Sequence, residues 1–196
     1  MYNILLNHIK ETYPEISDDD FTMIIKRTSI KSYPKKTILW REGDYVRESI
    51  FVIKGCFRYF TTDENGHERN TRFAMENWWF GDMQSILYHE PSKQSGQALE
   101  DSTAISFTKE DFKYLLENCE GLKRFTRIKR DRSYEANIKR LAEIHKPAEV
   151  RYENLIKKYP DALSRIPLYH IASYLGITPE SLSRLRKIIS SSENKK

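Results

Sequence analysis

The sequence predicts an α+β protein in which an antiparallel β-roll or barrel precedes a long helix and a C-terminal pair of short helices. Two observations lead to this prediction. In the first half, short segments rich in β-branched and aromatic residues alternate with turn residues such as Asn65-Gly66. After residue 107, apolar residues recur instead at intervals of three and four, which is the spacing of amphipathic helices.

Two helices are expected before the strands, one around Ile4 to Ile9 and one that begins after Ser17. Ser17 is a favourable N-cap, and the three aspartates that follow it suit the positive end of a helix dipole. The N-terminus lacks the basic start and apolar core of a signal peptide, so a cytoplasmic protein is expected. The strands are expected at residues 38–40, 49–53, 56–62 and 68–75, with residues 97–107 forming a strand pair or one long strand.

A long helix is expected from Glu120 to about Lys146, because no proline interrupts this segment. Four residues recur within it at the alternating spacing of a coiled coil and predict a dimer interface: Tyr134, Ile138, Leu141 and His145. Residues 123–146 also hold nine basic and three acidic side chains. This charge is typical of a solvated helix face, and it is equally compatible with contact to nucleic acid.

The stretch from Leu168 to Ile189 predicts two short helices joined by a tight turn. Gly176 suits a helix C-cap, because glycine adopts the left-handed conformation without strain. Thr178 suits the N-cap of the second helix, and Pro179 suits its first position. The pattern is that of a helix-turn-helix, whose second helix enters the DNA major groove. The alternative is an ordinary helical hairpin within an all-α domain.

The barrel, the long helix and the terminal helix pair together resemble the Crp/Fnr family of bacterial transcription regulators. The most specific parts are the block Leu175–Lys187 and the glycines of the segments Glu42-Gly43-Asp44, Lys54-Gly55 and Phe80-Gly81-Asp82. The resemblance implies a cyclic-nucleotide-binding-like β-roll, a homodimer paired through the long helix, and double-stranded DNA and RNA polymerase as partners. The residues implied to contact DNA are the base-reading Glu180, Ser181 and Arg184, the helix-starting Thr178, and the phosphate-contacting Arg186 and Lys187.

The sequence departs from this family in two places. Members that bind cyclic AMP grip its phosphate with an arginine after a Gly-Glu pair, whereas residues 83–100 here contain no arginine. We therefore expect cyclic AMP to bind weakly or not at all, because lysine lacks the bidentate fork of arginine. The effector is unknown, and the corresponding pocket would be formed by Gly81, Asp82, Lys93, Gln94 and Ser95. The second departure follows Arg184, where the usual β-hairpin wing is expected to be absent or truncated.

Other chemistries find little support in the sequence. The chain has 196 residues and a formal net charge of +5, which permits nucleic-acid binding without requiring it. The five histidines form no metal-binding pair, and two scattered cysteines cannot hold an iron–sulfur cluster. No residue pattern indicates haem, an enzyme nucleophile, a P-loop or a membrane span. Trp78 and Trp79 are expected in the core of the barrel, the alternative being that they stack on a ligand.

The sequence is therefore compatible with three functions. The first is a homodimeric DNA-binding regulator with an effector-sensing β-roll. The second is a ligand-independent regulator in which the barrel serves as a scaffold, and the third is a cyclic-nucleotide-binding module that regulates a protein partner. The helix-turn-helix favours the first two. The expected division is a sensor domain at 1–118, a dimerisation helix at 119–146 and a DNA-binding domain at 147–196.

Overall fold

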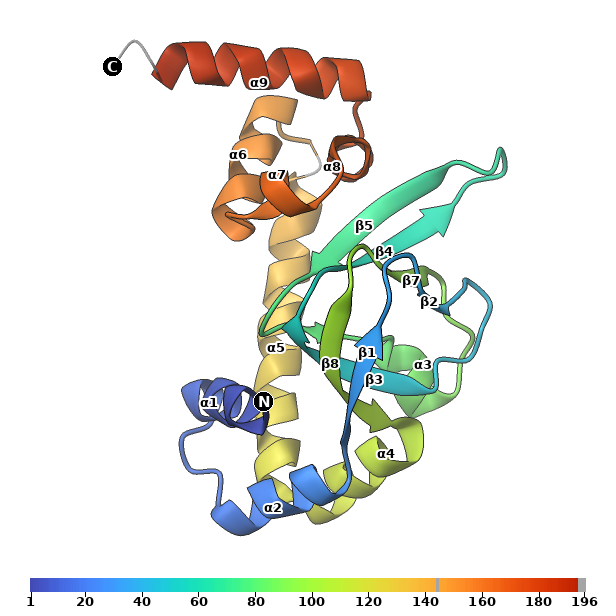
Figure 1. Cartoon of the computed structure of the whole chain (residues 1–196), viewed down its shortest axis with the longest axis vertical. Coiled ribbons are helices and arrows are strands. Elements are labelled where there is room, and N and C mark those ends of the chain that lie inside the picture. Colours follow the sequence, from blue (N-terminus) through green and yellow to red (C-terminus); the bar gives the residue numbers. More distant parts are fainter. Residues whose placement is uncertain (144, 194–196) are drawn as a thin grey trace.

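The computed structural model describes residues 1–143 and 145–193, and it shows an α+β chain with a β-rich lower half and a helical upper half (Figure 1). The helices are α1 Tyr2–Thr12, α2 Asp18–Lys26, α3 Met83–Tyr88, α4 Lys109–Asn118, α5 Glu120–Glu143, α6 Ala148–Lys158, α7 Ala162–Arg165, α8 Leu168–Leu175 and α9 Pro179–Glu193. The strands are β1 Ser29–Tyr33, β2 Ile38–Trp40, β3 Glu48–Lys54, β4 Phe57–Thr62, β5 Glu68–Ala74, β6 Trp79–Phe80, β7 Ser95–Ala98 and β8 Ser102–Thr108.

The strands form two four-stranded antiparallel sheets with the orders β1-β8-β3-β6 and β2-β7-β4-β5. The predicted antiparallel β-roll is confirmed, and its two sheets do not close on each other. The segment 97–107 contains two strands, as one of the two predicted alternatives has it, but these strands do not pair with each other. Its first part joins β2 and β4, whereas its second part joins β1 and β3.

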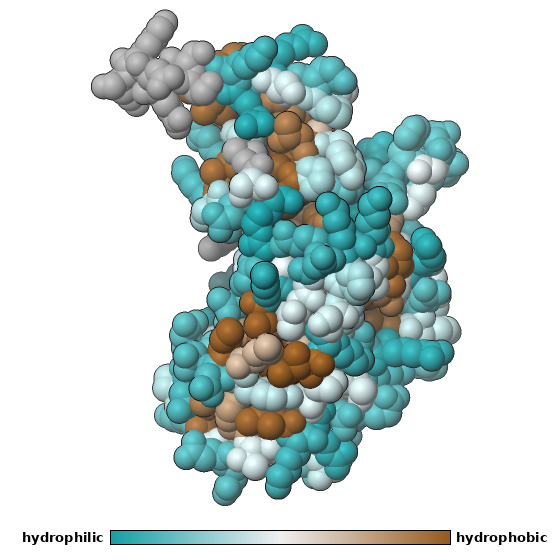
Figure 2. Space-filling view, in the orientation of Figure 1, coloured by the Kyte–Doolittle hydropathy of each residue, from teal (hydrophilic) through white to brown (hydrophobic). Residues whose placement is uncertain are grey.

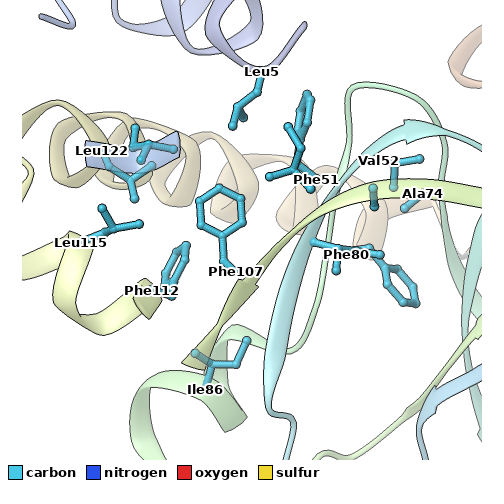
Figure 3. Close-up of a cluster of buried hydrophobic side chains, with 14 of the residues drawn as sticks. Leu5, Phe51, Val52, Ala74, Phe80, Ile86, Phe107, Phe112, Leu115 and Leu122 are labelled. Atoms are coloured by element: carbon cyan, nitrogen blue, oxygen red, sulfur yellow. The ribbon is translucent and has the colours of Figure 1, made fainter. Parts of the chain in front are cut away.

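Helices α1, α4 and α5 cover the outer sheet that contains β3 and β8. Phe107 of β8 is fully buried near the centre of this layer, among side chains of all three helices such as Leu5, Phe112 and Leu122 (Figure 3). The start of α2 at Ser17 is the one that the sequence predicts, and α4 begins in the same way. The Asp20 N–H donates to the Ser17 hydroxyl at 3.0 Å. The Asp111 N–H likewise donates to the Thr108 hydroxyl at 3.0 Å.

Three elements differ from the sequence prediction. The sequence did not predict strand β1 and helices α3 and α7. The long helix α5 is confirmed but ends at Glu143, so His145 lies in the turn that follows it. No strand follows α9 within the residues that the structure describes, since α9 itself continues to Glu193.

The helical upper half packs directly against the second sheet. In Figure 1, α8 lies beside β5, and the two elements are in contact. A second buried cluster combines Phe73 and Met75 of the sheet region with Tyr159, Ile171 and other side chains of α6 to α9. The α8–α9 pair is therefore anchored to the β-roll. In the described part of the chain, no helix is long and apolar enough to cross a membrane.

Candidate nucleic-acid interface

Helices α8 and α9 meet at a turn with the predicted geometry. Gly176 adopts the left-handed conformation, with φ 65° and ψ 33°. Its N–H donates to the carbonyl of Ser173 at 3.1 Å, and the N–H of Ile177 donates to the carbonyl of Ala172 at 3.0 Å. These bonds satisfy two carbonyls that the end of α8 would otherwise leave without partners. The chain therefore leaves α8 in a fixed direction.

The start of α9 is held by Thr178. Its hydroxyl accepts the N–H of Ser181 at 3.2 Å, and its carbonyl accepts the N–H of Leu182 at 3.0 Å. Pro179 occupies the first helical position, where no N–H donor is needed. The two caps fix the angle between α8 and α9, which is what a helix inserted into a DNA groove requires.

The two faces of α9 differ in character. Leu182 and Leu185 are buried against Ile171 and Leu175 of α8. Of the predicted DNA-contacting residues, Glu180, Arg184 and Lys187 lie on the opposite face and are exposed, Thr178 and Ser181 are exposed at the start of the helix, and Arg186 lies beside the packed face and is partly buried. This part of the molecule is mostly hydrophilic in the space-filling view (Figure 2). The structure therefore places all six predicted residues on or beside one accessible helix surface.

Charge is also organised at the start of α9. The backbone N–H of Glu180, the Thr178 hydroxyl and the positive charge of Arg184 lower the pKa of the Glu180 carboxyl below its ordinary value. Glu180 is therefore an anion at neutral pH and an acceptor for a base amino group. Arg184 lies one helical turn further along, beside a hollow of about 230 Å³ between α9 and the start of α6.

The residues predicted to form an effector pocket lie close together but are engaged with the protein itself. The Asp82 carboxylate caps α3 by accepting the N–H of Gln84 at 3.0 Å, and it also accepts the Ser92 hydroxyl at 2.7 Å. The Ser95 hydroxyl accepts the N–H of Glu42 at 2.9 Å. Lys93 is exposed.

Gly81 and Gln94 also form hydrogen bonds within the protein. The Gly81 N–H donates to the Tyr59 hydroxyl at 2.9 Å, and this hydroxyl lies 3.2 Å from the Gly81 carbonyl. The Gln94 carbonyl accepts the Trp40 indole N–H at 2.8 Å. The Trp40 ring is buried between the two sheets, with its centroid 4.8 Å from that of Phe80. Aromatic rings thus fill the space beside the predicted pocket.

Trp78 and Trp79 both pack within the protein. Trp79 contacts the rings of Phe51 and Phe107, with centroid distances of 5.6 Å and 5.0 Å. Trp78 lies 5.5 Å from Tyr159 of the helical half. Their packing accounts for the aromatic pair without a ligand. It also shows that Trp78 contributes to the contact between the two halves.

The residues predicted at the dimer seam are exposed on α5. The exposed fractions are 69% for Tyr134, 52% for Ile138 and 64% for Leu141. His145 is also exposed, but it lies beyond the end of α5. An apolar stripe that stays exposed among the described residues is the feature that a helix–helix interface would bury.

Two further groups of polar residues join the halves, and sequence reasoning assigned them no role. Arg165 of α7 donates to both carboxylate oxygens of Glu76 at 2.8 Å and also to the Glu100 carboxylate. On the other side, Arg58 of β4 contacts His170 of α8. No local sequence signal indicates this contact, because Arg58 points to the strand face opposite Phe57 and Tyr59, and a lone charged residue is expected at the surface.

The geometry supports neither a metal site nor a reactive thiol. Among the residues that the structure describes, no group of three or more His, Cys, Asp or Glu side chains is placed to hold a metal ion. Cys56 and Cys119 are free and buried, and burial raises the pKa of each thiol to about 12. Neither is an activated nucleophile.

Comparison with known proteins supports the same architecture. Residues 30–119 match the family model for the cyclic nucleotide-binding domain. The chain has the fold of the Crp/Fnr regulators. FixK2 from Bradyrhizobium japonicum is similar with a TM-score of 0.70 and 15% identity, over 85% of this chain and 86% of that one. The CLP regulator of Xanthomonas campestris gives 0.70 and 13%, over 90% and 93%.

A third similar structure is a variant of CooA from Carboxydothermus hydrogenoformans, with a TM-score of 0.63 and 19% identity over 86% of this chain and 79% of that one. Of these neighbours, CLP is described as a c-di-GMP-responsive global regulator. No curated protein matches the sequence. The Crp/Fnr-like fold thus extends over both the β-roll and the helical half.

Proposed function

We propose that this Crp/Fnr-like chain is a sequence-specific DNA-binding transcription regulator that acts as a homodimer. The proposal rests on the surface of α9. Glu180, Ser181 and Arg184 are exposed there, while the side of α9 that faces α8 is buried. Such a helix presents a few adjacent side chains to base edges while the rest of the motif holds it rigidly. The proposed division into domains at 1–118, 119–146 and 147–196 assigns this surface to the last of them.

The dimer completes the proposed DNA-reading unit. One recognition helix reads only a few base pairs, whereas two related by a two-fold axis read half-sites about 34 Å apart. The exposed Ile138 and Leu141 on α5 supply the apolar contact that would bring two copies together. His145 stays a predicted neighbour of that seam.

Base reading by Arg184 gives the sharpest test. Arginine reads guanine through a bidentate pair of hydrogen bonds, and each good pair contributes about 1–3 kcal/mol of discrimination. We therefore expect a G·C pair in the operator half-site, and we expect Arg184→Ala to relax the preference at that pair. The measurement is binding selection from randomised DNA with the dimeric full-length protein.

Lys187→Ala is the matched control, because Lys187 is exposed one turn nearer the C-terminus and is proposed to contact phosphate. It should weaken binding to all sequences alike and lower the salt slope by about one. Unchanged base preferences in Arg184→Ala, together with a reduced salt slope, would assign Arg184 to the DNA backbone. Selection of no sequence by the wild-type protein would contradict the proposed function itself.

The structure favours a second candidate in which the β-roll works without a ligand. Two observations favour it. The buried Trp40 ring fills space where an effector was predicted, and Asp82 and Ser95 already have hydrogen-bond partners within the protein. In this version the roll is a scaffold that positions the DNA-binding half and offers a surface to RNA polymerase. The two candidates share the DNA-reading surface and differ only in whether a small molecule controls it.

A further inference from the structure

Arg58 forms the sensor side of a buried junction between the β-roll and α8. Its side chain is only 4% exposed, although it carries a permanent charge. Its Nε donates to Gln97 at 2.8 Å, and its guanidinium pairs with Glu68 and lies 4.0 Å over the ring of Phe60. A further donor, Nη1, lies 3.2 Å from the ring atom Nδ1 of His170.

His170 forms the other side of the junction and is 5% exposed. The side-chain nitrogen of Asn70 lies 3.1 Å from the same Nδ1 atom and donates to the His170 carbonyl at 3.2 Å. One turn along α8, the Ser173 hydroxyl accepts the backbone N–H of Asn70 at 2.9 Å and donates to the Glu68 carbonyl at 3.0 Å. Strands β4 and β5 thus hold two successive turns of α8.

The chemistry of the junction requires a neutral imidazole. A guanidinium has donors and no acceptor, and the nitrogen of an amide also only donates. Both donors face the single lone pair of Nδ1, which accepts from one of them or is shared between them, and this places the ring hydrogen on Nε2. A proton on Nδ1 would remove this acceptor and set a second positive charge 3.2 Å from Arg58 in a buried site.

We propose that this junction is a proton-sensitive latch, in which neutral His170 holds α8 and α9 against the β-roll and protonated His170 releases them. The latch controls docking of the two halves, which goes beyond the proposed DNA binding and can be measured without DNA. It acts on a surface that already exists in one chain, so it needs neither the dimer nor an effector.

Burial, and then the charge of Arg58, lowers the pKa of His170 from 6.5 to about 4. The docked state therefore resists protonation, whereas a released His170 would titrate near its ordinary value. Docking weakens as pH falls towards 6.5, and it continues to weaken until pH is near 4. From these two pKa values, the docking equilibrium at pH 5.5 is about tenfold smaller than at pH 7.5.

The other groups at the junction do not reverse the direction of this pH dependence. Arg58 is a guanidinium and Asn70 does not titrate, and the Tyr169 ring lies tilted against that of His170 with a centroid distance of 4.0 Å. Glu68 faces His170 only through Arg58. At the second contact between the halves, the fork of Arg165 and the N–H of Gly55 hold the pKa of Glu76 below its ordinary value despite burial, so this carboxylate remains charged at pH 5.5.

Hydrogen exchange at Asn70 tests the latch directly, because its N–H is bonded to Ser173 across the junction. In the full-length protein, the protection factor of this amide should fall about tenfold between pH 7.5 and 5.5. In His170→Gln, whose amide oxygen can accept the same donors without titrating, the protection factor should stay constant. A constant protection factor in the wild-type protein, or the same fall in His170→Gln, would overturn the proposal.

His8→Gln is the matched control. His8 is the other histidine whose pKa is lowered to about 4, and it packs against Phe51 and Phe125, away from the junction. This variant should keep the tenfold response at Asn70. If His170→Gln fails to dock, an NMR titration of His170 in the wild-type protein decides. A pKa near 4 with the hydrogen on Nε2 supports the latch, and a pKa of about 6 or above refutes it.

Discussion

Substitution of Gly96 by alanine should destabilise the β-roll through one identifiable contact. A Cβ at this position would lie 2.5 Å from Cη2 and 2.6 Å from Cζ2 of the Trp40 ring. The ring has little freedom to move, since it is buried, donates to the Gln94 carbonyl at 2.8 Å and packs against Tyr59 and Phe80. The added methyl group must therefore displace a ring that is held on several sides.

The size of the effect follows from core packing. Overpacking by one methyl group costs about 1–3 kcal/mol, and a rigid neighbour favours the upper part of that range. Trp40→Leu removes the opposing ring and should itself cost about 3 kcal/mol, near the lower end for loss of a large aromatic side chain. In that background Gly96→Ala should cost almost nothing, since the space is then free. The two substitutions should therefore couple by about 2 kcal/mol.

The assay is urea unfolding followed by circular dichroism for the wild-type protein, both single variants and the double variant. Serine at Gly66 is a suitable control for this double-mutant cycle, because nothing lies within 4 Å of a Cβ there and its cost should reflect only the positive φ of 80°. It should not couple to Trp40→Leu. If Gly96→Ala leaves the free energy of unfolding unchanged, or if its cost persists without Trp40, then the ring does not fill the space beside the predicted pocket.

Two further predictions concern the dimer and the effector. Replacing both Ile138 and Leu141 by lysine should give monomers in sedimentation velocity and weaken operator binding sharply, because the exposed apolar stripe of α5 then carries charge. A variant that stays dimeric with full affinity would place the seam elsewhere. Cyclic AMP should show no micromolar binding in calorimetry, because Trp40 is buried between the sheets and no arginine lies between Gly81 and Glu100. Micromolar affinity would contradict both arguments.

The helix-turn-helix could be predicted from the sequence because its determinants are local. Gly176, Thr178 and Pro179 each act on the one or two residues beside them, so their conformational preferences are visible without knowledge of the fold. The same holds for the starts of α2 and α4 at Ser17 and Thr108. Local chemistry therefore predicted these element boundaries well.

Strand β1 and helix α3 could not be predicted in this way. Four of the five residues of β1 are exposed, so the strand shows no apolar pattern, and it is defined by pairing with residues of β8 that lie 69 to 77 positions later. Helix α3 has only six residues, too few to show a helical period. Its start depends on Asp82, which the sequence indicated as part of a pocket.

The buried junction was missed for a related reason. The burial of Arg58 depends on His170, 112 positions away, and a charged residue in isolation is expected at the surface. The pairing of Arg165 with Glu76 spans 89 positions. From the sequence, charged residues were expected at the surface and apolar residues in the core. These expectations fail where two domains meet through paired polar groups.

The contact between the halves holds α8 against the β-roll, and it leaves exposed the face of α9 that is proposed to read DNA. The face of α9 that carries Arg184 stays exposed while α8 is held by Asn70 and Arg58. In the proposed dimer, α5 fixes the two-fold axis, and the docked β-roll fixes the angle at which each α9 stands relative to that axis. Since half-sites are about 34 Å apart, a small change in docking would alter the spacing of the two helices and hence their fit to both half-sites at once. Regulation through this contact would therefore act on the geometry of a pair of helices, each of which remains able to touch DNA.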